Sequence, residues 1–420
     1  MMELQNWTVC KGLNCARSKM MIAQIKNRIE EVFDEVVAIR RYLHMHPELS
    51  NQEEKTMVFI SEYLTKLGIP HKTNVGGHGV VGIIGDPKAE VAIGIRADID
   101  ALPIQEMNDV PYTSTVPGVM HACGHDIHTA VLLGTAKILK EMEGKLSGAV
   151  KLFFQPAEEQ GGGARQMIAE GCMQEPPVVR TLGFHVDTTT PAGHLVFFPQ
   201  QVNACSSGLE IVVRGKSCHG SRPDRGVDAI IASAHIITAV QNIVSRFIPP
   251  AKPAVLSVGT IHGGTKGNII ADEVRMTGTI RTMDLQTRDF IKERLQMVVQ
   301  SAAASCGATA EVNIKNGYPP IINDSSVTAM LQNLADKLLG PESYTVKTEA
   351  GMGGEDFSYF ANEVPSCYFR LGILGDNGGY EQTLHNERFC PDERCMKNGM
   401  LIEVMGALAL LEDAMCDFQV

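Results

Sequence analysis

The sequence has no excess of basic residues and no long apolar run. Its 37 lysines and arginines are outnumbered by 48 aspartates and glutamates, so the formal net charge is -11. Nucleic acids and anionic membrane surfaces repel an acidic protein, which makes both poor candidates as partners. No continuous apolar run reaches the roughly 18 residues of a membrane-spanning helix. We therefore expect a protein that binds neither nucleic acid nor membrane.

The first 20 residues lack the apolar stretch of a signal peptide and show no clear periodicity. We interpret residues 1–20 as an N-terminal extension and expect a cytoplasmic protein. The 11 cysteines are odd in number, and in a reducing compartment most should be free thiols. Structural zinc at Cys10 and Cys15, or at Cys390 and Cys395, is disfavoured because no second ligand pair lies at a typical distance.

Internal repeats and low-complexity tracts are also absent. Hydrophobic residues make up 44% of the chain and charged residues 20%, which is ordinary globular usage. This composition excludes a disordered chain, a collagen and a simple coiled coil. The 420 residues suffice for two or three domains with a large core.

Hydrophobic periodicity predicts an α/β core. Apolar residues at every third or fourth position predict a helix that begins at residue 20 or 21 and ends before Pro47. The spacing Asn51-x-x-Glu54 resembles a capping box and predicts a second helix, which stops at Gly68. Further predicted elements are strands at 79–84, 91–97, 149–154 and 179–184 and a helix at 127–142. Alternating strands and helices indicate a largely parallel sheet.

The middle of the chain predicts an inserted ferredoxin-like domain. The expected strands lie at 208–214, 254–261, 270–281 and 308–315, and the helices at 226–246 and 285–304. This β-α-β-β-α-β order is that of a split ferredoxin-like unit. A helix at 324–338, a strand at 366–372 and a helix at 393–414 then resume the first pattern. We thus predict one catalytic domain, residues 21–203 and 317–420, interrupted by an insert at 204–316.

Polar residues follow the predicted strands at the edge where α/β sheets bind ligands. Asp98 and Asp100 leave one strand and point the same way, although alone they could form a solvated turn. Cys123 and His125 flank a glycine, and thiolate and imidazole are strong ligands for zinc and related ions. The alternative for this pair is a polar helix N-terminus.

Two further strand ends add a carboxylate pair and a histidine. Glu158 and Glu159 are adjacent, so their side chains diverge, and one could bind a metal while the other acts as general base. Alone they would suggest an exposed acidic turn, and His185 alone a hydrogen-bonded core residue. Together, the four segments bring metal-ligating residue types to one sheet.

Weaker candidates lie in glycine-rich loops. Gly353 belongs to a segment that allows close backbone approach to a ligand, and His385 lies in a polar loop and could be a last ligand. His219 follows a predicted strand of the insert. Asn268 ends a glycine-rich loop that lacks the Gly-Lys-Ser/Thr of a phosphate loop, which disfavours nucleotide binding.

These residues resemble a known family. From about Val37 to the C-terminus the chain is similar to the di-metal amidohydrolases and aminoacylases, which include hippurate hydrolase, the plant indole-acetyl-amino-acid hydrolases and N-acetyl-diaminopimelate deacetylase. They form a branch of the metallopeptidase superfamily that contains glutamate carboxypeptidase. The most specific stretches are, in chain order, RADIDALPI, MHACGHDIH, FFQPAEE, GFHV and GMGGEDF.

The resemblance implies a two-metal catalytic domain and an inserted lid that also dimerises. The implied metal ligands are Cys123, His125, Glu159, His185 and His385. Glu158 matches the general base. The superfamily's usual His-x-Asp reads Arg96-Ala97-Asp98 here, so Asp98 is expected to orient a ligand from behind.

The resemblance also assigns roles within the insert. His219 would reach the active site of the partner subunit and polarise the scissile carbonyl. Asn268 would lie near the substrate, and Arg281 would bind its carboxylate. Gly353, in the catalytic domain, is a further substrate-binding candidate.

The predicted function is metal-dependent hydrolysis of the amide bond of N-acyl amino acids. The expected cofactors are two divalent ions, zinc or manganese, with cobalt or nickel possible. The expected assembly is a homodimer or a dimer-based homo-oligomer. Two alternatives remain open at this point, a dipeptidase or carboxypeptidase with the same site, and a metal-free binding protein without activity.

Overall fold

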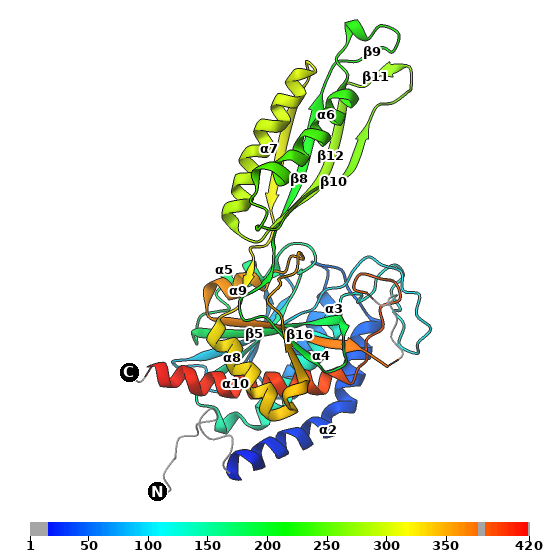
Figure 1. Cartoon of the computed structure of the whole chain (residues 1–420). Helices are drawn as coiled ribbons and strands as arrows, with labels where there is room; N and C mark the ends of the chain where they lie inside the picture. Colours follow the sequence, from blue (N-terminus) through cyan, green and yellow to red (C-terminus); the bar gives the residue numbers. More distant parts are fainter. Residues whose placement is uncertain (1–15, 377–382, 419–420) are drawn as a thin grey trace. The chain divides into compact units, whose positions relative to one another are not determined.

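The computed structural model describes residues 16–376 and 383–418, which form two compact units. The second unit comprises Val202–Ile321 and Ala350–Glu355, and the other described residues form the first (Figure 1). The second unit is thus slightly longer than the insert predicted at 204–316. It also takes in the short segment with Gly353, which the sequence analysis placed in the catalytic domain.

The first unit is built on an eight-stranded sheet with the order β1-β2-β4-β3-β5-β16-β6-β15. At its centre β3 is parallel to β4 and β5, and β5 is parallel to β16, whereas β1 and β2 add antiparallel pairs at one side. The predicted α/β class with a mostly parallel sheet is therefore correct. The strands are β1 (His71–Val75), β2 (Gly79–Ile84), β3 (Ala92–Asp98), β4 (Ala149–Gln155), β5 (Val178–Pro191), β6 (Leu195–Phe197), β15 (Tyr344–Val346) and β16 (Ser366–Leu374).

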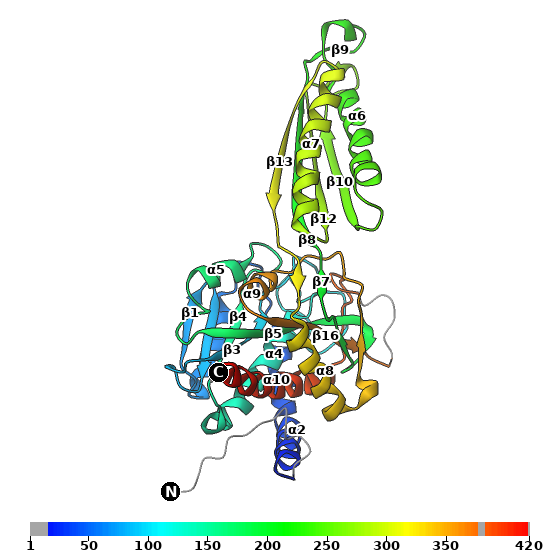
Figure 2. The same cartoon turned by 60° about the vertical axis from the view of Figure 1, so that its left-hand side comes forward.

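Helices cover this sheet and complete its core. The long helices α2, α4 and α10 pack against one another, and α4 and α10 also contact β3 (Figure 2). Nearly every residue of α4 is buried, including the polar residues His125, Asp126 and His128 of its first turn. The helices are α2 (Ala16–Met45), α3 (Glu54–Lys66), α4 (His125–Glu141), α5 (Gly163–Ala169), α8 (Ser325–Leu339), α9 (Ser358–Glu363) and α10 (Cys395–Phe418), with short helices η1 (Glu143–Lys145) and η4 (Pro341–Ser343).

The second unit has a four-stranded antiparallel sheet with the order β10-β12-β8-β13. Its core lies between one face of this sheet and two helices. In chain order the main elements are β8 (Cys205–Arg214), α6 (Ala229–Asn242), β10 (Ala254–Gly263), β12 (Glu273–Thr282), α7 (Leu285–Ser305) and β13 (Thr309–Asn316). The shorter elements are β7 (Gln201–Asn203), β9 (Cys218–His219), η2 (Pro223–Arg225), η3 (Ile243–Phe247), β11 (Ile269–Ile270) and β14 (Ile321–Ile322).

Two predicted helix starts differ from the structure. Helix α2 already begins at Ala16, inside the expected extension, whose first 15 residues lie outside the described part. The capping box at Asn51 is wrong, since Asn51 has φ 66° and its amide donates to the Gln160 carbonyl (2.9 Å). The Glu48 carboxylate accepts the first-turn N–H of Thr56 instead (2.8 Å). Helix α3 is therefore capped by Glu48, a residue of the preceding loop, and not by Asn51.

One helical stretch of the second unit, Ala229–Phe247, has the length and composition of a membrane span, with a mean hydropathy of 1.2. Polar residues interrupt it, and its helix α6 packs Ala232, Ile236 and Val240 into the core of the unit. Ile230 and Ile231 on the same helix are 47% and 52% exposed. The stretch is therefore a core-packed helix with an additional apolar surface, and its hydropathy is weak evidence for a membrane segment.

Candidate metal centre

The ends of β3 and β4 bring two acidic segments together. The strands are parallel, and Asp98 pairs with Gln155 in the ladder. The residues that follow each strand therefore emerge at the same edge of the sheet, as the strand-end argument predicts. A hydrogen bond from the Glu159 backbone N–H to the Asp100 carboxylate (3.0 Å) joins the two loops.

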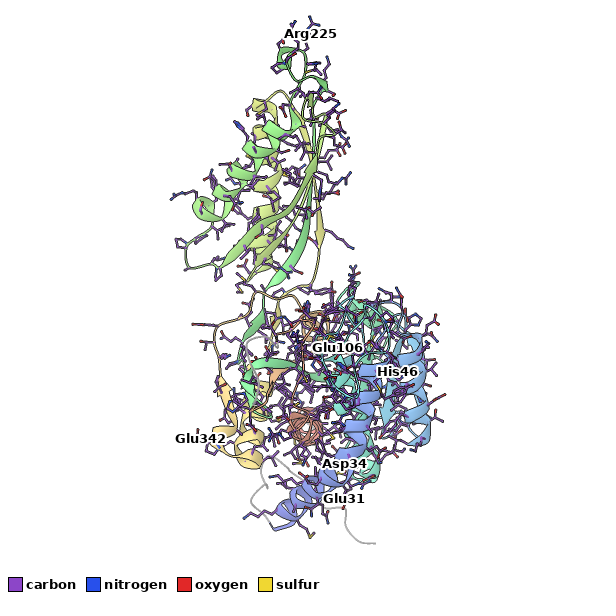
Figure 3. The ribbon with its side chains drawn as sticks, turned by 90° about the vertical axis from the view of Figure 1, so that its right-hand side faces the viewer. Glu31, Asp34, His46, Glu106, Arg225 and Glu342 are labelled. Atoms are coloured by element: carbon purple, nitrogen blue, oxygen red, sulfur yellow. The ribbon has the colours of Figure 1, made fainter. Side chains whose placement is uncertain are left out.

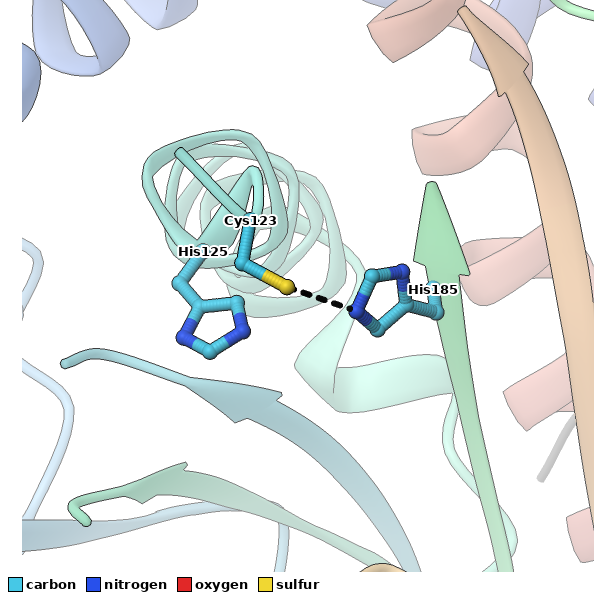
Figure 4. Close-up of side chains that lie close together, drawn as sticks. All are labelled: Cys123, His125 and His185. Carbon is cyan, nitrogen blue, oxygen red and sulfur yellow. Dashed lines mark hydrogen bonds between the residues drawn. The ribbon is translucent and has the colours of Figure 1, made fainter. Parts of the chain in front are cut away.

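The third segment forms the N-terminus of α4. Gly124 has φ 83°, and a Cβ at this position would lie 2.6 Å from a methyl group of Val186. Only glycine suits this turn. Cys123 and His125 flank it, and the Cys123 Sγ lies 3.3 Å from the Nε2 of His185 on β5 (Figure 4). His185 lies within β5, which extends beyond the predicted strand to Pro191.

Hydrogen bonds leave one ring nitrogen of each histidine available. The Nδ1 of His185 is 2.9 Å from the Val186 carbonyl, and the Nδ1 of His125 is 2.9 Å from the Asp100 carbonyl. Each Nδ1 is therefore placed to donate to an oxygen, and each Nε2 is the ring nitrogen that lies toward the other candidate ligands. Among the described residues, the buried Nε2 of His125 has no hydrogen-bond partner. A buried acceptor without a donor fits a site that binds a cation.

The predicted ligands fall into three overlapping groups, in each of which all ligand atoms lie within 4.8 Å of one another. These groups are Cys123, His125 and His185; Cys123, Glu159 and His385; and His125, Glu158 and Glu159. The structure thus brings the five predicted ligands and the predicted base together, and Cys123 belongs to two groups. Thiolate, imidazole and carboxylate are the donors that zinc and neighbouring divalent metals prefer.

His385 comes from a loop far away in the sequence. Its Nε2 lies 3.2 Å from the Glu159 carboxylate, and its backbone N–H donates to the Ala122 carbonyl (2.8 Å). Its φ of 59° is unusual for a residue with a side chain, and such backbone strain is often retained at functional sites. The Glu159 contact raises the pKa of His385.

Burial sets the protonation of Cys123 and His185. Burial raises the pKa of the Cys123 thiol well above its usual value and lowers that of His185 well below it. Without a cation this pair is therefore a neutral thiol and a neutral imidazole. A neutral imidazole is the metal-binding form, whereas the thiol must lose its proton to bind a cation.

The carboxylate that orients His125 is not the one expected. Asp98 accepts hydrogen bonds from His128 (2.6 Å) and Arg96 (2.7 Å), and its nearer oxygen is 3.6 Å from the His125 Nε2. The direct contacts to the Nδ1 of His125 come from Asp100, which the sequence analysis noted without giving it a role.

His128 was also missed. Its Nε2 accepts the N–H of Val186 (3.1 Å) and its Nδ1 bonds to Asp98, so both ring nitrogens are used. It therefore connects the end of β3 to the part of β5 that carries His185. Its spacing of three residues from His125 in the sequence was the available signal.

The other predicted residues lie in the second unit. His219 on β9 is paired with Ile269, and the Gly220 N–H donates to the Asn268 carbonyl (2.8 Å), so His219 and Asn268 are neighbours. Strand β9, which carries His219, contacts η2. Arg225, the last residue of η2, is labelled in Figure 3 and shows where this part of the second unit lies. Arg281 lies on β12, and Gly353 in the segment Ala350–Glu355.

Comparison with known proteins identifies the family. A sequence model of the peptidase family M20/M25/M40 matches residues 94–405. The chain belongs to this family.

Proteins similar to this chain are named for different activities. Thermostable carboxypeptidase 2 of Saccharolobus solfataricus is 40% identical over 392 residues, which cover 92% of this chain and 98% of that protein. N-acetyl-L-cysteine deacetylase of Bacillus subtilis is 36% identical over 359 residues, or 86% of this chain and 84% of that protein. The Bacillus subtilis YXEP protein, described as a dinuclear metal binding peptidase, has a TM-score of 0.78 at 32% identity and covers 91% of this chain and 99% of its own.

The M20 assignment confirms the predicted resemblance. The protein is a hydrolase of amide bonds in a metallopeptidase-like family, and its structural relatives include a dinuclear metal-binding protein. This sets aside the alternative without enzymatic activity. The names of the relatives span carboxypeptidase and deacetylase, so they leave the choice of amide substrate open.

Proposed function

We propose that this M20 enzyme hydrolyses N-acyl amino acids to a carboxylic acid and an amino acid. The observation that carries the proposal is the sharing of Cys123 between two ligand groups, one with His125 and His185 and one with Glu159 and His385. Such sharing suits two neighbouring divalent cations. The deacetylase among the relatives supports an N-acyl substrate, because its name specifies an N-acetyl amino acid.

Divalent cations bound here supply a Lewis acid that polarises the amide carbonyl and makes water more acidic. Zinc or manganese are the proposed ions, and the ligand set also suits cobalt or nickel. Glu158 is buried beside His125 and Glu159. In this proposal its carboxylate accepts a proton from the attacking water and delivers that proton to the leaving nitrogen. Asp100 and His128 keep the histidine ligands oriented during this cycle.

A substrate panel tests the proposal. The purified protein is assayed with zinc, manganese, cobalt or nickel on N-acetyl and N-benzoyl amino acids and on dipeptides. We expect the N-acyl amino acids to be cleaved with the higher kcat/KM. Cleavage of dipeptides alone would favour the carboxypeptidase or dipeptidase alternative, which the name of the Saccharolobus relative supports. No cleavage with any metal would contradict both.

We also propose a homodimer in which His219 serves the partner's site. The Nδ1 of His219 accepts hydrogen bonds from the Ser221 N–H (3.1 Å) and hydroxyl (2.8 Å), so a neutral ring carries its proton on the exposed Nε2. An Nε2–H can donate to a carbonyl oxygen as negative charge develops there. Exposed Ile230, Ile231 and Ile261 on α6 and the edge strand β10 support self-association of the second unit.

Mixing two inactive variants tests this sharing. His219→Ala lacks the donor, and Glu158→Gln lacks the base. In a mixed dimer one site keeps both residues, so subunit exchange should restore up to about a quarter of wild-type activity. The measurement is turnover after exchange, with each variant incubated alone as control. Absence of rescue where mass spectrometry shows mixed dimers would contradict the shared site.

We place the enzyme in a reducing, cytoplasmic environment. Support comes from the cysteines of the described part, which are free, including the buried Cys123, Cys172, Cys205, Cys367 and Cys395. A free thiol at position 123 is what the proposed metal site requires.

A further inference from the structure

The turn that carries Glu158 and Glu159 begins at a strained residue. Ala157 has φ 55°, a left-handed conformation that residues with a side chain rarely adopt. Ala157 is buried, and its carbonyl accepts the N–H groups of Gly162 (3.0 Å) and Gly163 (3.4 Å). The chain therefore turns back on itself soon after β4, and the two glutamates lie within this turn.

This turn decides where the two carboxylates point. In an extended strand the side chains of adjacent residues point to opposite faces. Here, however, the carboxylates of both Glu158 and Glu159 lie within 4.8 Å of a ring nitrogen of His125. The turn at Ala157 thus brings the proposed base and a proposed metal ligand to the same histidine.

A buried carboxyl group holds the first residue of the turn. Glu53 lies just before α3, is fully buried, and accepts the N–H of Ala157 (2.8 Å). Burial raises the pKa of Glu53. In the part of the chain that the structure describes, its second oxygen, Oε2, is buried without a hydrogen-bond partner. Burying an unused polar oxygen costs free energy, so packing alone would favour an apolar residue at this position.

The same loop also contacts the other side of the glutamate pair. The side-chain amide of Asn51 donates to the carbonyl of Gln160 (2.9 Å). The loop before α3 therefore holds the residues immediately before and after the two glutamates. The Asn51 contact is exposed to water, whereas the Glu53 contact is buried and hence the stronger of the two.

We propose that Glu53 is a positioning residue, because its hydrogen bond keeps Ala157 in the left-handed conformation that directs both glutamates into the metal centre. Glu53 touches neither substrate nor metal in this proposal and acts only through the backbone of Ala157. The inference rests on the proposed function for the role of Glu158 as base and of Glu159 as ligand. It adds that catalysis depends on a hydrogen-bond acceptor at position 53.

Variants at position 53 test the proposal. Glu53→Met keeps the length of the side chain but has no oxygen acceptor, and it should lower kcat by roughly 10- to 100-fold, the effect of a displaced catalytic group. The affinity for zinc, measured by competition with a chelator, should fall by a similar factor because Glu159 belongs to the same turn. Glu53→Gln should keep both quantities within about threefold of wild type, since an amide oxygen accepts the same N–H.

A glycine at position 157 separates positioning from a role in folding alone. Glycine adopts a positive φ without strain, so Ala157→Gly by itself should change kcat and zinc affinity little. Added to Glu53→Met, it should restore both at least about fivefold, the strain of one left-handed alanine. A role of Glu53 in folding alone predicts no such recovery.

The matched control is Glu54→Met, because Glu54 is the next residue and is exposed in the first turn of α3. It should behave as wild type. Wild-type kcat and zinc affinity in Glu53→Met, or a loss that Ala157→Gly does not reduce, would overturn the positioning role.

Two further outcomes also decide the role of Glu53. If Glu53→Met does not fold, Glu53→Gln decides alone, and a loss above about threefold overturns the proposal. Chelator competition needs no substrate, so it tests Glu53 even where the substrate panel contradicts the proposed function.

Discussion

Replacing Glu158 by glutamine is expected to lower kcat by about 10²- to 10⁴-fold, the usual contribution of a general base. Glutamine keeps the size of the side chain but has no carboxylate that accepts a proton. Glu158 is buried within 4.8 Å of the ligand atoms of His125 and Glu159, where it can reach a water bound between them. The variant should retain its metal, because Glu159 and the histidines are unchanged.

Turnover and metal content are measured on the same preparation. Glu159→Gln is the informative comparison, since it should lose metal as well as activity. Glu54→Gln is the control, because Glu54 is an exposed residue in the first turn of α3. Near-normal turnover of Glu158→Gln would rule out the general-base role. Loss of metal in that variant would instead make Glu158 a ligand.

Cys123→Ala is expected to abolish activity and to reduce bound metal from two ions to one or none per chain. Cys123 belongs to both ligand groups, so its thiolate is the donor whose loss affects both positions. Burial raises the pKa of this thiol, and a bound cation would offset that cost by stabilising the thiolate. Removal of metal from wild-type protein by a chelator should reproduce the loss of activity.

Elemental analysis and activity are compared with Cys172→Ala. Cys172 is also buried, and burial raises the pKa of its thiol to about 12, but it belongs to none of the ligand groups of the described residues. That variant should keep both its metal and its turnover. Unchanged metal stoichiometry in Cys123→Ala would show that Cys123 only fills space in the core.

The repeating elements could be predicted from the sequence because their signals are local. Strands such as β2 and β4 are short and mostly apolar, and α4 and α10 are long segments rich in apolar residues without proline. The order of elements in the second unit was visible for the same reason. The ends of the predicted strands then indicated which polar residues could bind a metal together. The segments of Cys123, Glu159 and His185 do lie close to one another.

Contacts between distant segments could not be predicted in the same way. The sequence offered Asp98 and Asp100 as equivalents, and only the packing of α4 against the end of β3 assigns Asp100 to His125 and Asp98 to His128. The capping of α3 by Glu48 likewise depends on the path of the loop before it.

The position of the second unit in the chain has a consequence for stability. His185 precedes this unit and His385 follows it, yet both belong to ligand groups that contain Cys123. Cations bound to these groups would act as non-covalent cross-links that close the chain around an independently packed insert. Because the unfolded chain does not hold these ligands together, the free energy of metal binding adds to the stability of the first unit. Metal supply would then govern whether this part of the chain stays folded, as well as whether it turns over substrate.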